Sequence, residues 1–135
     1  MLKVFAAMLL SACLAHGAED TDRLNDAAGK YIAAKDPDKK KAEAWGKKFK
    51  AKVEQRAEDS RRGFDEAAQL VAFDWMSDRS AALKAKEDKA ILELCRLFKW
   101  LEANRVAIPA TALEEMRKDA KIGKLSEWLE TEAKK

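Results

Sequence analysis

Carboxylates are the side chains of this sequence best suited to acid–base chemistry, and a group of them lies between residues 58 and 78. A hydrolase built on paired carboxylates needs two of them in one cleft with different pKa values. Here the acidic residues alternate with arginines at helical spacing, which is typical of ion pairs on a helix surface. The acidic residues are Glu58, Asp59, Asp65, Glu66, Asp74 and Asp78, and the arginines are Arg56, Arg61, Arg62 and Arg79. We therefore place a carboxylate-based hydrolase third among the functions considered.

Other catalytic arrangements are missing from the sequence. The single histidine, His16, lies in an N-terminal segment that we expect to be removed. Its loss excludes His-based triads, His-x-x-x-His zinc pairs and Cys–His pairs from the mature chain. Gly29-Lys30 and Gly46-Lys47 lack the upstream glycine of a Walker A loop, and there is no Ser-x-x-Lys dyad. The sequence therefore predicts no enzyme, no cofactor and no metal site.

One thiol is placed for a covalent modification. Leu10-Ser11-Ala12-Cys13 has the four residues of a lipobox in order. In this respect the chain resembles bacterial lipoproteins, and the resemblance covers these four residues only. It implies that Cys13 receives lipid. A competing cleavage site, Ala15-His16-Gly17 before Ala18, would leave a chain without lipid.

The segment before these two sites has the order of a secretory signal. Lys3 is its one charge, and an apolar run from Val4 to Leu10 is followed by small residues. A spanning helix needs about 20 apolar residues, so this run is too short to stay in a membrane. Either residues 1–18 are a signal peptide, or residues 1–12 are the signal, Cys13 carries lipid and residues 14–20 form a linker. Both predict an exported protein, with residues 21–135 as a single helical domain.

The composition is that of a helical protein. Hydrophobic residues make up 47% and charged residues 38% of the chain, with only five glycines and two prolines. Apolar residues recur every three or four positions and no strand period is visible, so we expect a small all-α domain of four to six helices. Cys95 lies in an apolar stretch, which predicts a buried thiol without a disulfide partner in the mature chain.

Capping residues divide the chain into helices. Asp36 followed by Pro37 fits an N-cap and first helical position, and the apolar spacing then continues to about residue 77. Residues 37–77 therefore form either one long helix with a bend near Ser60–Gly63 or two helices. We expect the most apolar helix, about residues 81–103, to be central. Thr111 fits the N-cap of a later helix, and we expect a break at Gly123.

The strongest functional signal is a basic segment. Eight lysines lie between residues 35 and 52 against three acidic residues, a local net charge of +5. On a helical wheel Lys41, Lys48 and Lys52 border the edge occupied by Trp45, and Phe49 lies nearby. These five residues are a candidate site for an anionic surface, membrane headgroups or cell-wall polymer, with the aromatic rings dipping in. In the alternative, which we favour, the two rings belong to the core and the lysines surround them.

The sequence thus predicts an exported, non-catalytic bacterial envelope protein, lipid-anchored at Cys13, that acts as a binding or scaffolding module. The alternative is a free periplasmic or secreted adaptor or inhibitor that docks a protein partner through its basic helix. Export separates the chain from nucleic acid, so nucleic acid is not expected as a partner. The oligomeric state and the identity of the partner stay open.

Overall fold

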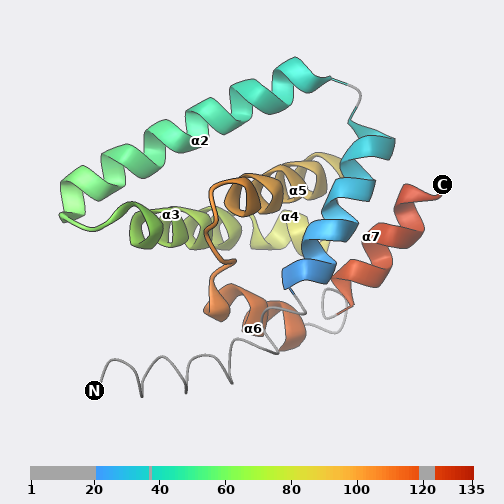
Figure 1. The fold of residues 1–135 in the computed structure, drawn as a ribbon. Coiled ribbons are helices and arrows are strands. Elements are labelled where there is room, and N and C mark those ends of the chain that lie inside the picture. Colours follow the sequence, from blue (N-terminus) through green and yellow to red (C-terminus); the bar gives the residue numbers. More distant parts are fainter. Residues whose placement is uncertain (1–20, 37, 119–123) are drawn as a thin grey trace.

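The computed structural model describes residues 21–36, 38–118 and 124–135, and these ranges are helical with no strand (Figure 1). The predicted all-α class is confirmed. The expected signal and lipid site, including Cys13 and His16, lie outside the described residues, as do Pro37 and the expected break at Gly123. The helices are residues 21–35, α2 (Lys39–Ser60), α3 (Phe64–Asp78), α4 (Ser80–Lys84), α5 (Asp88–Ala103), α6 (Ala110–Lys118) and α7 (Leu125–Ala133).

Residues 37–77 do not form one long bent helix. α2 and α3 are separate helices that run in opposite directions and pack against each other (Figure 1). Arg61 ends α2 in the left-handed region at φ 52°, and the N–H of Arg62 donates to the carbonyl of Ala57 at 3.1 Å. This is the hydrogen bond of a Schellman motif, a common end for an α-helix. Gly63 then serves as the N-cap of α3, so the chain reverses where a bend was expected.

The helix expected over residues 81–103 is also divided. α4 ends at Lys84, and Lys86 adopts φ 54°. The N–H of Glu87 donates to the carbonyl of Ala82 at 3.1 Å, which is again the long bond of a Schellman motif. No glycine or proline marks this break in the sequence. The additional short helix raises the number of helices among the described residues above the expected four to six.

α2 begins two residues later than expected. Its N-cap is Asp38, whose carboxylate accepts hydrogen bonds from the backbone N–H groups of Lys40 and Lys41 at 3.1 and 3.2 Å. Asp36, the expected N-cap, still belongs to the end of the preceding helix, because its own N–H donates back to that helix at 2.8 Å. Its Oδ2 pairs with Arg96 of α5, and its Oδ1 accepts a hydrogen bond from the N–H of Asp38 at 3.4 Å. The expected cap was wrong because Asp38 accepts from the free N–H groups in the first turn of α2, while Asp36 ends the preceding helix and pairs with Arg96.

α5 lies at the centre of the domain, as its apolar sequence predicted. It packs against α2, α3 and α4, and a row of its side chains has almost no exposed surface: Ile91, Leu94, Cys95, Leu97, Phe98 and Leu101. The helix of residues 21–35 lies beside α7, where the rings of Tyr31 and Trp128 stack with their centroids 6.3 Å apart (Figure 1). Burial of this much aliphatic and aromatic surface stabilises the fold.

α6 starts directly after a proline. It begins at Ala110, and the N–H of Leu113 donates to the carbonyl of Pro109 at 3.1 Å. Thr111, the expected N-cap, therefore lies inside the first turn of the helix. α6 packs against α3, with the buried Ala112 and Leu113 on the face toward the core. This arrangement sets α6 opposite α3 and α4 and defines the cleft described below.

Candidate functional site

The outer surface of α2 carries a strip of three lysines, which we call the lysine strip: Lys41, Lys48 and Lys52. All three side chains are exposed. Their spacing of seven and four residues places them along one side of the helix. Within the described part of the chain, none of the three forms an ion pair with a carboxylate. The basic half of the predicted site is therefore displayed together on one face.

Further lysines extend this positive surface. Lys39, Lys40, Lys47 and Lys50 are also exposed, and only Glu43 carries a negative charge within residues 39–52. Lys50 pairs with Glu54 at 3.8 Å, but both side chains are 60% exposed, so water screens this pair strongly. Asp36 contributes little negative field here, because it is buried against Arg96. The first four turns of α2 thus form a surface dominated by positive charge.

The aromatic half of the predicted site faces the core. Phe49 is only 3% exposed, and its ring stacks on Trp45 at 5.2 Å and meets Trp100 at 4.7 Å. Trp45 is partly buried and meets Trp75 edge-on at 6.5 Å. These rings and Phe64 form an aromatic cluster between α2, α3 and α5. Phe49 is not available to dip into a membrane, which corrects that part of the surface-binding interpretation.

The same packing holds the lysine strip in place. α2 approaches α5 closely at Gly46, where an added Cβ would lie 3.4 Å from Cδ1 of Trp100. On the other side Arg56 donates to Asp74 of α3 at 3.1 Å. The backbone of α2 is thus held at its N-cap and along its inner face, which fixes the positions from which its lysines emerge.

The carboxylates of residues 58–78 are spread over an exposed surface. Asp74 of α3 pairs with Arg56 of α2. Glu66, in the first turn of α3, pairs at 3.1 Å with Arg62, which lies just before that helix. Asp59 accepts a hydrogen bond from a neighbouring side chain on α2. Across the described ranges, no three His, Cys, Asp or Glu side chains gather closely enough to hold a metal ion. The pairing with arginine at helical spacing is present for Glu66, whereas Asp74 pairs with an arginine of another helix.

Cys95 is a buried, unpaired thiol, as predicted. It has no exposed surface and packs in the core of α5. Burial removes the solvation that a thiolate needs and raises the pKa of this thiol to about 12. At neutral pH the group is therefore fully protonated and is not a nucleophile.

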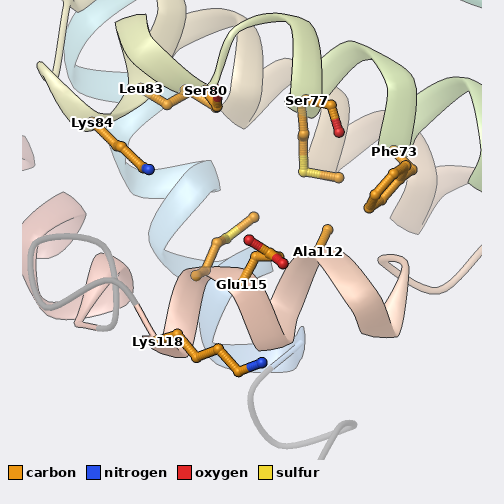
Figure 2. Close-up of a pocket in the computed structure, with 10 residues that line it drawn as sticks. Phe73, Ser77, Ser80, Leu83, Lys84, Ala112, Glu115 and Lys118 are labelled. Carbon is orange, nitrogen blue, oxygen red and sulfur yellow. The ribbon is translucent and has the colours of Figure 1, made fainter.

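A cleft between α3, α4 and α6 was not foreseen from the sequence. Its volume is about 600 Å³, and Figure 2 shows side chains from both walls pointing into the space between the helices. It is lined by Phe73, Met76, Ser77, Ser80, Leu83, Lys84, Ala112, Glu115, Met116 and Lys118. We call it the α6 cleft. No sequence signal located it, and two of its apolar residues, Phe73 and Met116, are only partly buried against the core.

The comparisons with known proteins add no family to this description. None of the helices in the described ranges is both long and apolar enough to cross a membrane. The chain matches no protein-family model, no curated protein and no solved structure. Function must therefore be inferred from the residues and the geometry of this chain alone.

Proposed function

We propose that this protein is an exported, non-catalytic module of the bacterial cell envelope, anchored through lipid on Cys13, which docks onto an anionic membrane surface through the lysine strip of α2. The observation that carries the proposal is the display of Lys41, Lys48 and Lys52 on one exposed face, without ion-pair partners among the described residues. Anionic headgroups attract basic residues by about 1 kcal/mol for each lysine near the surface.

The mode of contact follows from the aromatic cluster. An amphipathic helix that lies in a membrane interface buries its apolar face among the lipids. In α2 that face is already used against α3 and α5, with Phe49 and Val53 buried. Docking of α2 is therefore electrostatic and peripheral. It weakens as salt rises, because charges at a surface are screened over about 8 Å at physiological ionic strength.

A lipid at Cys13 and the lysine strip would act together. A single acyl chain binds a membrane only marginally, and firm attachment takes a second signal such as more chains or a basic patch. The anchor would keep the domain near the headgroups, and the lysines would orient it with α2 toward them. Cleavage before Ala18 instead would leave a free protein, in which the same helix face would dock an acidic protein partner.

Vesicle binding tests the role of the lysine strip. We expect the chain with Lys41, Lys48 and Lys52 all replaced by Gln to bind anionic vesicles about 100-fold more weakly at low salt, because three contacts of about 1 kcal/mol each are lost. A matched control replaces Lys30, Lys89 and Lys124, which are exposed and lie outside α2. Vesicle sedimentation at two salt concentrations measures both variants, and equal losses in the two would show that only net charge matters.

Fractionation and intact mass test the anchor separately. We expect the wild-type protein in the membrane fraction with the mass of a lipid-modified chain that begins at Cys13. Cys13→Ser should move it to the soluble fraction and leave the helical circular dichroism unchanged. An unmodified chain that begins at Ala18 would contradict the anchor, while the vesicle experiment would still report on the lysine strip.

A further inference from the structure

The α6 cleft has the size and lining of a small-molecule site. Its volume of about 600 Å³ lies within the range of about 300–1,000 Å³ typical of ligand pockets. One wall comes from α3 and α4, with Phe73, Met76 and Leu83, and the other comes from α6, with Ala112 and Met116. Methionine side chains adapt their shape to irregular apolar partners. The cleft therefore suits an apolar body of modest size.

The polar side chains that line this apolar space are a carboxylate, two serine hydroxyls and two lysines. Figure 2 shows Glu115 reaching from α6 toward α3 and α4, where Ser77 and Ser80 lie on the opposite wall. Within the described ranges, the Glu115 carboxylate has no hydrogen bond or ion pair. A carboxylate accepts hydrogen bonds only, and a serine hydroxyl accepts as well as donates. A ligand that donates hydrogen bonds and carries positive charge would satisfy all three.

The two lysines of the cleft differ from Glu115 in their arrangement. Lys118 lies on the far side of α6 in Figure 2, with its amine directed away from the space between the helices. Lys84 reaches toward the cleft from the end of α4 and already makes an interaction of its own. Glu115 is thus the charged group of the cleft that points inward and has no partner among the described residues.

We infer that the α6 cleft binds a small molecule with an apolar body and one protonated amine. The apolar body lies between Phe73, Met76 and Met116, and the ammonium group donates to Glu115, with Ser77 or Ser80 as a second acceptor. An ammonium–carboxylate contact is stronger than a bond between neutral groups, and because Glu115 is exposed, water screens part of this attraction. The site is separate from the lysine strip, because its walls are α3, α4 and α6 and not α2.

Three probes with the same eight-carbon chain test the proposed head group: octylammonium, 1-octanol and octanoate. We expect octylammonium to bind with a Kd on the order of 0.1–1 mM, octanol more weakly and octanoate weakest. Nuclear magnetic resonance of methionine methyl groups labelled with ¹³C locates binding, because Met76 and Met116 lie in the walls of the cleft. Shifts of both methyl signals, with octylammonium preferred, would support the proposal.

Two variants and one control complete the test. Glu115→Gln should weaken octylammonium binding about threefold, because the lost ion pair is exposed to water, and leave octanol binding unchanged. Glu114→Gln is the matched control, since Glu114 is the preceding residue, is exposed and does not line the cleft. Met116→Trp should fill the cleft and abolish binding of all three probes in calorimetry. Octanoate or octanol binding as tightly as octylammonium, equal effects of Glu115→Gln and Glu114→Gln, or methyl signals that do not move would each overturn the assignment.

Discussion

The buried ion pair between Asp36 and Arg96 gives the sharpest test of how this fold is held together. Arg96 donates to Oδ2 of Asp36 through Nε at 2.9 Å, and its Nη2 lies 2.8 Å from the same oxygen. The side chain of Arg96 is only 13% exposed and that of Asp36 only 4%. The pair connects α5 to the segment between the helix of residues 21–35 and α2, so it fixes the point at which α2 leaves the first helix.

Asp36→Asn removes the charge while keeping the shape of the side chain. Breaking a buried pair by removing one partner costs about 3–5 kcal/mol, because the remaining charge is left uncompensated. Asn retains one acceptor oxygen for Arg96, so we expect a loss near the lower end, about 3 kcal/mol in the free energy of unfolding. Since small domains are stable by about 5–15 kcal/mol, this is a large fraction of the total.

Urea unfolding followed by circular dichroism measures the effect, with two comparisons. Glu66→Gln breaks the exposed pair with Arg62, whose side chains are 53% and 67% exposed, and should cost less than about 0.5 kcal/mol. Adding Arg96→Met to Asp36→Asn should recover most of the loss, because an apolar side chain leaves no buried charge. A loss below about 1 kcal/mol for Asp36→Asn, or a double variant less stable than the single one, would refute this reasoning.

Two further predictions concern the end of α2 and the core thiol. Arg61→Gly should raise the free energy of unfolding by about 0.5–1 kcal/mol, because Arg61 has φ 52° and glycine adopts that conformation without steric cost; thermal unfolding that shows a less stable variant would contradict this. Cys95 should resist thiol reagents in the folded protein at pH 8 and react fully in denaturant, because burial raises its pKa to about 12. Between about pH 9 and 12 the unfolded chain releases the Cys95 proton while the folded chain keeps it, so the free energy of unfolding is highest below pH 9 and falls as the pH rises toward 12. Rapid labelling of Cys95 in the native protein at pH 8 would contradict its burial.

The helical class and the central place of α5 were predictable, because both follow from local periodicity. Leu94, Leu97, Phe98 and Leu101 repeat at the spacing of one helix face, and all are buried. A bend or a break was expected near residues 60–63 from Gly63; the left-handed residue is in fact Arg61, and the glycine is the N-cap of the next helix. The local sequence pattern therefore indicated where the helix is interrupted, but not which residue takes the left-handed conformation.

The break at Lys86 and the true N-cap of α2 were not predictable in the same way. Lys86 takes a left-handed conformation that lysine rarely adopts, and no glycine announces it. Asp36 and Asp38 both suit an N-cap; Asp38 takes that position in the structure, while Asp36 pairs with Arg96 of α5. The partner of Asp36 lies 60 residues away along the chain, so no local pattern indicates it.

The candidate sites differ in the same way: those formed by one helix were predictable, and those formed by several helices were not. The lysine strip depends on spacing within one helix, so Lys41, Lys48 and Lys52 were identified together. The inward direction of Phe49 depends on Trp100 of another helix, and sequence reasoning left it as one of two alternatives. The α6 cleft requires that Phe73 and Glu115, from helices far apart in the chain, face the same space. That arrangement follows from the packing of three helices and has no local sequence pattern.

The aromatic cluster also determines what the intrinsic optical signals of this protein report. Trp45, Trp75 and Trp100 belong to one network of ring contacts around Phe49, so their emission and near-ultraviolet circular dichroism describe the packing of α2 on α3 and α5. Trp128 stands apart, stacked on the single tyrosine, Tyr31, with the amine of Lys86 5.2 Å from its ring. A chain in which Trp128 is replaced by Phe would isolate the first signal, and the difference from the parent spectrum would follow the attachment of α7 to the first helix.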